Sequence, residues 1–368
     1  MSTLIVAAGG GGDAVAAIML SRFIAPDQGL PYIATYAWER LRIDPQPGPR
    51  GADGFTGLGS IGDYAVEIVG SSETIPPGCS TLPRLRDSAE CRLFLLDPTR
   101  GATGMRGQLQ SLVSSLSITK LVVLDVGGDV LARGDEPELL SPMADALAVA
   151  AVLGMDVEVE VAVAGPGIDG ELSESYTLAS LQQLGGNKVA TVEAKDADKV
   201  FALLDWHPSE ATALLAASAT GVVGRVEIRR FNKIVELTES SSSLWTVDPS
   251  KIVEQSLLVG ALAKTNSLDD VEDAIRKVTV SELDYERTKA VRIDKLRLQE
   301  LDSSEISNRV RAYSRDAKLR GVDYITGRRL AEAIEVPTFT IHELLATLGA
   351  DPNDYLRGAL LDVMQLAV

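Results

Sequence analysis

The sequence predicts an α/β protein with a doubly wound, mostly parallel, Rossmann-like sheet and a helical C-terminal extension. Two observations favour this class. Short apolar runs typical of buried strands alternate with longer helical patterns along most of the chain. After about residue 250 the strand signals fade and helical patterns follow one another. We therefore expect an α/β domain over residues 1–265 and a helical extension over residues 266–368.

The strands are expected where apolar and β-branched residues cluster, at Thr3–Ala8, Pro31–Ala37, Tyr64–Val69, Arg92–Leu96, Lys120–Asp125, Val157–Ala164 and Lys188–Val192. The helices between them are expected at Asp13–Phe23, Gly107–Leu116, Pro137–Leu153 and Leu172–Leu184. A two-strand hairpin follows, at Arg225–Arg230 and Ile234–Leu237. The extension is expected to contain helices at Ser267–Val278, Val280–Leu301, Ser304–Leu319, Thr326–Ala333 and Thr340–Leu348.

Two segments rich in glycine and proline, Ile43–Asp63 and Glu73–Asp87, interrupt the alternation. Long loops in compact domains are often functional, so one interpretation is that they fold over a ligand. The alternative is a disordered insertion.

Composition limits the classes of function. The 368 residues are 45% hydrophobic and carry a formal net charge of −17, which argues against non-specific binding to nucleic acid or to an anionic membrane. The N-terminal sequence does not resemble a signal peptide and no apolar run has transmembrane length, so we expect a cytoplasmic protein. Only His207 and His342 are present, which excludes a multi-histidine metal centre. We expect a small-molecule ligand, and a homo-oligomer is an open alternative.

Polar residues follow five of the predicted strands. In open α/β sheets, ligands bind beyond the carboxyl ends of the strands, so these residues are expected to share one cleft. They lie in the segments Gly9–Asp13, Trp38–Arg40, Asp97–Arg100, Asp125–Asp129 and Gly165–Glu171.

The segment Asp125-Val126-Gly127-Gly128-Asp129 is the most specific of these. Closely placed carboxylates can separate their pKa values and act as acid and base, or they can hold Mg²⁺ or a cationic group. We expect Asp125 and Asp129 to transfer protons or bind a cation. Gly127, Gly128 and Asp97, which follows another predicted strand, are expected to contact substrate. A turn with capping aspartates is the alternative interpretation.

Asp169 and Glu171 stand where a helix is expected to begin. We assign them to the catalytic group as well, orienting the substrate, although acidic residues also favour a helix N-terminus for purely structural reasons.

The glycine run also matches a dinucleotide fingerprint. Gly9, Gly10, Gly11 and Gly12 precede Asp13 and Ala14, which fits G-x-G-x-x-A, and Glu39 after the second strand could bind a ribose. The spacing to Glu39 is long for this motif, and the carboxylate of Asp13 would repel a pyrophosphate. The cofactor therefore stays open between a nucleotide, NAD(P), Mg²⁺ and none of these.

Arg40 and Arg50 are the candidate anion-binding residues, because one follows a strand and the other ends the stiff turn Pro47–Arg50. Surface salt bridges are the alternative for both. His207 is expected to cap a helix or lie on the surface. Neither Cys79 nor Cys91 has an evident activating base, so a thiol nucleophile is not expected.

Several segments in combination resemble an uncharacterised family of archaeal and bacterial proteins called domain of unknown function 1152. The resemblance rests on AAGGGGDAVAA, WER…DPQPGPR, DVGGDVLARGDEPELLSPMAD and AGPGIDGEL, and it covers about residues 3 to 275. It implies no activity. From the residues themselves we expect an enzyme that acts on a small polar metabolite, anionic, amine-bearing or nucleotide-like, by acid–base chemistry. The alternatives are a ligand-binding or regulatory protein without turnover and an NAD(P)-dependent oxidoreductase.

Overall fold

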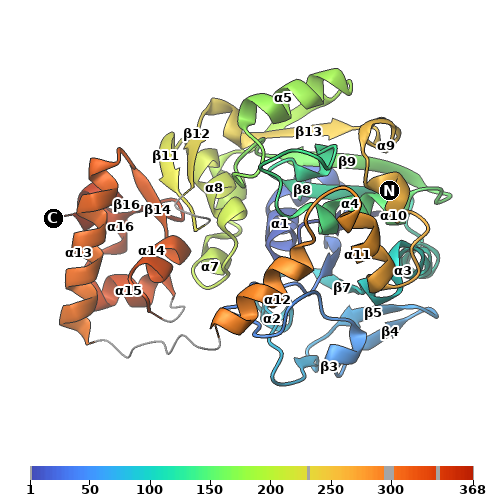
Figure 1. The fold of residues 1–368 in the computed structure, drawn as a ribbon, viewed down its shortest axis with the longest axis horizontal. Helices are drawn as coiled ribbons and strands as arrows, with labels where there is room; N and C mark the ends of the chain where they lie inside the picture. Colours follow the sequence, from blue (N-terminus) through green and yellow to red (C-terminus); the bar gives the residue numbers. More distant parts are fainter. Residues whose placement is uncertain (1, 230–232, 294–301, 337–339, 368) are drawn as a thin grey trace.

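The computed structural model describes residues 2–229, 233–293, 302–336 and 340–367. Its main feature is a mixed nine-stranded sheet in the order β10-β13-β9-β8-β1-β2-β7-β5-β4 (Figure 1). The five central strands are parallel and have the bounds Thr3–Ala7 (β1), Tyr32–Tyr36 (β2), Arg92–Leu96 (β7), Lys120–Val126 (β8) and Glu158–Ala164 (β9). The expected α/β class is confirmed.

The outer strands join this parallel centre through antiparallel pairs. Their bounds are Ser243–Val247 (β13), Asn187–Thr191 (β10), Ala65–Ile68 (β5) and Gly59–Ile61 (β4). β13 was not predicted from the sequence, and it lies between β9 and β10. The strands predicted at Val157–Ala164 and Lys188–Val192, which correspond to β9 and β10, are therefore not neighbours in the sheet.

Helices cover both faces of the sheet because successive residues of a strand point to opposite sides. Ile5 and Ala7 of β1 pack with α1 (Gly11–Ile24), α2 (Leu82–Ser88) and α8 (Glu210–Ala219). Leu4 and Val6 pack on the other face with α3 (Gly101–Leu116) and α4 (Pro142–Val152). The chain runs from β1 to β2 and β7 and then returns to β8 on the other side of β1. The sequence order of the strands thus reverses between β1 and β8.

The connections contain shorter elements. The helices of the connections are α5 (Glu174–Gln183), α6 (Ala194–Ala197), α7 (Phe201–Leu204), α9 (Pro249–Gln255), α10 (Val259–Leu262), α11 (Leu268–Arg276) and α12 (Glu282–Ile293). The two glycine- and proline-rich segments pair with each other through β3 (Phe55–Thr56) and β6 (Glu73–Thr74), and both contain regular structure. The predicted helix Val280–Leu301 is observed up to Ile293, and its remainder lies outside the described residues. The predicted helix from Pro137 begins at Pro142, because a proline at the first position suits a helix start.

The C-terminal region differs from the purely helical extension that we expected. Its helices α13 (Ser303–Leu319), α14 (Gly327–Ala333), α15 (Ile341–Leu348), α16 (Pro352–Tyr355) and α17 (Val363–Leu366) are accompanied by β14 (Tyr324–Thr326), β15 (Leu356–Arg357) and β16 (Leu360–Asp362). We call α13 to α17 with these strands the C-terminal unit. Strands this short give no readable alternation in the sequence.

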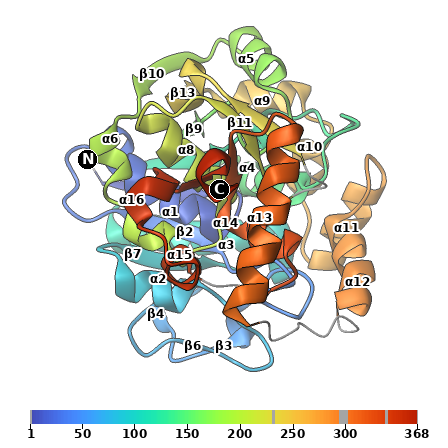
Figure 2. The same cartoon turned by 90° about the vertical axis from the view of Figure 1, so that its left-hand side faces the viewer.

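The C-terminal unit has its own apolar core and also extends a second sheet. That sheet has the order β12-β11-β14-β16-β15, so the unit adds its strands to the predicted hairpin of β11 (Gly224–Glu227) and β12 (Ile234–Leu237). Figures 1 and 2 show the unit gathered at one end of the molecule, beside β11 and β12. None of the helices in the described ranges combines the length and the apolar character that crossing a bilayer requires.

Candidate functional site

A cavity of about 170 Å³ lies at the carboxyl ends of β1, β8 and β9. β1 and β8 are the neighbours between which the strand order reverses, and this is where open α/β sheets bind their ligands. Two sets of charged side chains line the cavity. We call Asp13, Asp125, Asp129, Asp145, Asp169 and Glu171 the acidic group, and Arg40, Arg229 and Arg328 the basic group.

Asp13 enters the cavity from the first turn of α1. The glycine loop permits this because Gly10 has a φ of 94° and a Cβ on Gly9 would lie 2.7 Å from Asp13 Oδ2. The backbone N–H of Gly9 instead donates to that oxygen at 2.9 Å. Burial and the nearby charge of Asp125 raise the pKa of Asp13 well above its usual range. The glycine loop therefore holds a carboxylate at the position where the dinucleotide motif would hold a phosphate.

Asp125 is placed by the turn that follows β8. Its Oδ2 accepts hydrogen bonds from the backbone N–H groups of Gly128 at 3.0 Å and Val130 at 3.1 Å. The turn needs glycine at Gly127 and Gly128, whose φ values are 128° and 115°. Burial raises the pKa of Asp125 to about 6 even though these N–H groups favour its ionised form.

Asp169 approaches Asp125 from the loop after β9. A Cβ on Gly127 would lie 2.4 Å from Asp169 Cγ, so the two loops are in close contact. Burial and the charge of Glu171 raise the pKa of Asp169 to about 7. Burial and Asp169 in turn raise the pKa of Asp129 well above its usual range. Protons are therefore expected to be shared within this group near neutral pH.

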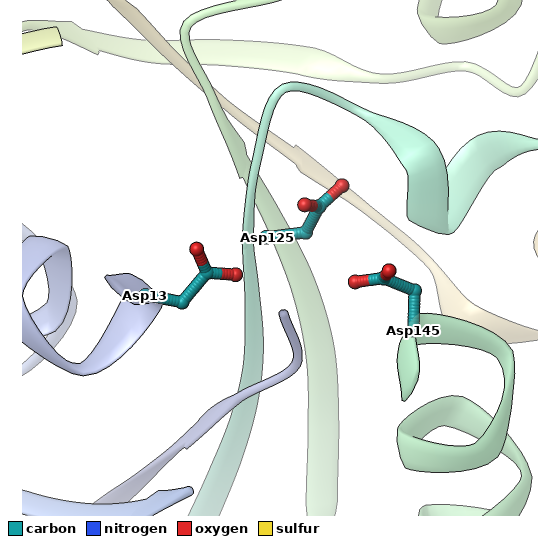
Figure 3. Close-up of side chains that lie close together, drawn as sticks. All are labelled: Asp13, Asp125 and Asp145. Atoms are coloured by element: carbon teal, nitrogen blue, oxygen red, sulfur yellow. The ribbon is translucent and has the colours of Figure 1, made fainter. Parts of the chain in front are cut away.

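Asp145 completes the acidic group from the first turn of α4. It is 4% exposed, and its Oδ1 has no hydrogen-bond partner among the described residues. Figure 3 shows Asp13, Asp125 and Asp145 directed toward one another from three different elements. Burial and the charge of Asp125 raise the pKa of Asp145. A buried carboxylate oxygen without a protein partner points to an absent proton, water or cation.

The carboxylates fall into two sets that could each hold a cation. Asp13, Asp125 and Asp145 each offer one oxygen, and these oxygens lie within 4.8 Å of one another. Asp129, Asp169 and Glu171 form a second set of the same kind. Oxygen-only ligands of this type suit Mg²⁺ or Ca²⁺.

Glu171 also has a structural role. Its Oε2 accepts from the backbone N–H of Leu140 at 2.7 Å and of Ser141 at 2.9 Å, at the N-terminus of α4. Glu171 therefore caps α4 and not the helix that follows it in the sequence, which is capped by Ser173. The same carboxylate also lies in the cavity.

Two further carboxylates reach the cavity from α12. Glu282 Oε2 accepts from the backbone N–H of Met143 at 2.8 Å, and burial with the charge of Glu171 raises the pKa of Glu282 to about 8. Glu286 accepts from Trp38 Nε1 at 3.1 Å and from the backbone N–H of Gly48 at 2.8 Å. Their spacing of four residues places both carboxylates on one face of α12, toward the cavity.

Glu39 and His207 form a hydrogen-bonded chain with Thr81. Glu39 Oε1 accepts from the backbone N–H of Thr81 at 2.8 Å and from its Oγ1 at 2.6 Å. His207 Nε2 lies 3.2 Å from the same hydroxyl. Because the hydroxyl hydrogen goes to Glu39, Nε2 is the donor and Nδ1 carries no proton. Burial lowers the pKa of His207 to about 3, so it is neutral.

The cavity brings most of the predicted site residues together. Its lining includes Gly9, Gly11, Gly12, Asp13, Glu39, Arg40, Asp125, Asp129, Asp169 and Glu171. Gly10, Gly127 and Gly128 shape the loops behind that lining.

Arg50 and Asp97, which we expected to contact substrate, lie elsewhere. The guanidinium of Arg50 pairs with the buried carboxylate of Asp44, which satisfies it locally. Asp97 accepts from the backbone N–H groups of Thr99 at 2.9 Å and Ala52 at 2.8 Å and so caps a short helical turn. Asp97 thus has a capping role, and Arg50 forms a largely buried ion pair, not the surface salt bridge that was the alternative for it.

Sequence reasoning missed the residues that come from distant segments: Glu282, Glu286, Arg229 and Arg328. Asp145 was not assigned to the site either. Only Asp145 had a usable signal, because it lies in an acidic stretch, shortly after the proline that begins α4.

The fold and the cavity define an α/β protein with a carboxylate-rich cavity beside β1 and β8, where the strand order of its sheet reverses. The family described as Protein of unknown function (DUF1152) has a model that matches residues 4–290, so the chain belongs to this family. This confirms the resemblance found in the sequence. Neither the curated proteins nor the solved structures contain a match.

Proposed function

We propose that this protein is an enzyme that acts on a small polar metabolite by acid–base chemistry at the acidic group. The observation that carries the proposal is the pair Asp125 and Asp169, which share one cavity and have pKa values of about 6 and about 7. General acids and bases work best when their pKa values lie near the working pH. Ordinary surface carboxylates titrate near pH 4 and lack this property.

The hydrogen bonds suggest how the two roles are divided. Asp125 accepts from two backbone N–H groups, which stabilise its charge, so it is the better candidate for the base. Asp169 keeps its proton to higher pH and is the better candidate for the acid. The neighbouring carboxylates couple to both, so the pair titrates as part of the whole acidic group.

A divalent cation is the second candidate for this group. The two sets of three carboxylates have the ligand type of Mg²⁺, and Asp145 of the first set has an Oδ1 without a hydrogen-bond partner among the described residues. A cation at Asp13, Asp125 and Asp145 would polarise a bound oxygen and lower the pKa of the carboxylates around it.

We also propose that the sheet is a doubly wound, Rossmann-like sheet. The parallel strands have the order β7-β2-β1-β8-β9, which corresponds to the order 3-2-1-4-5 of doubly wound dinucleotide-binding folds. A bound dinucleotide is nevertheless disfavoured. Asp13 takes the N–H of Gly9, and Glu39 is engaged by Thr81 and is not available to a ribose.

A thiol mechanism is also disfavoured. Burial raises the pKa of Cys91 to about 11, and burial likewise raises the pKa of Cys79. Neither thiol is therefore a nucleophile at neutral pH.

The test is a comparison of wild type with Asp125→Asn and with Asp269→Asn, a control at an exposed aspartate of α11. Each protein is incubated with a cell metabolite extract, with and without Mg²⁺, and mass spectrometry follows which molecules are consumed and formed. We expect turnover by wild type and the control, and a loss of roughly a hundredfold or more in Asp125→Asn. A molecule that copurifies with wild type and is never altered would favour the non-catalytic alternative. Equal turnover in all three proteins would refute the proposed role of Asp125.

A further inference from the structure

The basic group is assembled from three segments that are far apart in the sequence. Arg40 follows β2, Arg229 follows β11, and Arg328 lies in the first turn of α14, within the C-terminal unit. The family match ends at residue 290, so Arg328 comes from a part of the chain beyond it.

Strand pairing explains why Arg229 and Arg328 meet. β11 and β14 are parallel and in register, with Val226 opposite Tyr324 and Glu227 opposite Ile325. The carboxyl ends of parallel neighbours lie at the same edge of a sheet, so the residues that follow both strands emerge side by side. Thr326 fixes this geometry because its Oγ1 accepts from the backbone N–H of Arg329 at 3.1 Å and donates to Glu210.

The arginines are incompletely satisfied by the protein. Arg328 Nη1 donates to the carbonyl of Pro208 at 2.9 Å, while its buried Nη2 has no hydrogen-bond partner within the described ranges. Arg229 Nε lies 3.8 Å from Glu210 Oε2, a distance too long for a hydrogen bond. Burial and the charge of Arg328 lower the pKa of Arg229, so these cations disfavour one another. A buried guanidinium N–H without a partner is expected to donate to a ligand.

We infer that Arg40, Arg229 and Arg328 form a subsite for a phosphate group of the ligand, which the C-terminal unit completes through Arg328. This inference rests on the proposed function, because it names the substrate class for the same cavity. Guanidinium groups bind phosphate through paired, charge-assisted hydrogen bonds. A phosphate, with up to two negative charges, also balances more of the basic group than a single carboxylate does.

The acidic group favours a phosphate for a second reason. Mg²⁺ in proteins is commonly held by one or two carboxylates together with substrate phosphates. The two groups face the same cavity, because residues of both groups line it. A phosphate with its cation would satisfy both groups at once.

The test uses titration calorimetry with inorganic phosphate and pyrophosphate as probes, each with and without Mg²⁺. The variants are Arg328→Gln, the conservative Arg328→Lys, and Arg311→Gln as a control at an exposed arginine of α13 in the same unit. We expect wild type and Arg311→Gln to bind pyrophosphate equally. Arg328→Gln should bind about tenfold to a hundredfold more weakly, and Arg328→Lys should recover part of the loss. Circular dichroism melts establish that each variant is folded.

Three results would overturn the inference: wild type that binds neither probe, folded Arg328→Gln that binds like wild type, or citrate that binds as tightly as pyrophosphate. These outcomes are distinct from failure of the proposed function. Asp125-dependent turnover without Arg328-dependent phosphate binding would refute the inference alone. Arg328-dependent phosphate binding without any turnover would support the subsite and refute the enzyme.

Discussion

Replacing Asp169 with asparagine is expected to stabilise the protein, and to do so by more at pH 8 than at pH 5. Burial and Glu171 raise the pKa of Asp169 from its ordinary value of 3.8 to about 7, so the folded state binds this proton more tightly than the unfolded state does. Stability therefore falls as the pH rises from about 4 through about 7, and the loss is complete above the folded-state pKa.

The size of the effect follows from the same shift. A rise of roughly three pKa units, at about 1.36 kcal/mol each, sets an upper limit of about 4 kcal/mol at pH 8. Because the acidic group titrates together and the cavity admits water, we expect asparagine to recover about 2 kcal/mol of it. Asparagine keeps a carbonyl oxygen that can accept the backbone N–H of Glu171, now 3.3 Å from Asp169 Oδ1.

The assay is urea unfolding at pH 5 and pH 8, followed by circular dichroism in metal-free buffer. Asp269→Asn on the exposed face of α11 is the matched control and should change little at either pH. If the variant gained equal stability at both values of pH, or lost stability at pH 8, ionised Asp169 would not destabilise the folded protein. Either result would refute the reasoning.

Three further predictions concern the cation, the loop and the C-terminal unit. Mg²⁺ at a hundredfold excess over its Kd should stabilise wild type by about 2.7 kcal/mol at pH 8, whereas Asp145→Asn should lose most of this shift in a thermal melt. No shift with wild type would exclude Mg²⁺ binding to the folded state. Gly127→Ala should cost at least about 2 kcal/mol more than Gly154→Ala in urea, because its Cβ would lie 2.4 Å from Asp169 Cγ while that of Gly154 meets no described atom within 4 Å. Equal costs would show that the contact between the two loops relaxes freely. Glu227→Gln should destabilise by about 3 kcal/mol, since the buried Glu227 pairs with Arg329 at 2.9 Å and Arg320 at 2.7 Å, whereas the exposed Glu236→Gln should be neutral in the same assay.

The five parallel strands at the centre of the fold could be predicted from the sequence. Parallel strands that are covered on both faces appear in a sequence as continuous apolar runs. The predicted Arg92–Leu96 coincides with β7, and β1, β2, β8 and β9 differ from their predictions by one or two residues. The strands that were not predicted carry no such signal. β13 contains Ser, Trp and Thr, and the strands of the C-terminal unit have only two or three residues. Their position is determined by pairing with a partner that is remote in sequence.

The same contrast holds for the site. Asp13, Asp125 and Asp169 could be predicted because each follows a strand beside glycine, and strand ends meet at one edge of a parallel sheet. Glu282 and Arg328 could not be predicted because each lies on a helix whose charged residues look like a solvated face. Only tertiary packing turns these particular side chains toward the cavity. Local sequence patterns therefore predict the side chains at strand ends. They do not predict the residues that enclose the cavity, because those come from segments distant in the sequence.

The charges in this cavity are arranged in a way that folding alone does not favour. Like charges crowd within each group, and a buried charge without a partner is costly. If stability were the only constraint, the two groups would pair with each other across the cavity and remove both penalties. Instead Asp145 Oδ1 and Arg328 Nη2 each lack a hydrogen-bond partner in the described part of the chain. A ligand that carries positive charge at one end and negative charge at the other would relieve both groups together. Such a ligand would gain binding energy from the hydrogen bonds that these atoms do not make within the described part of the protein.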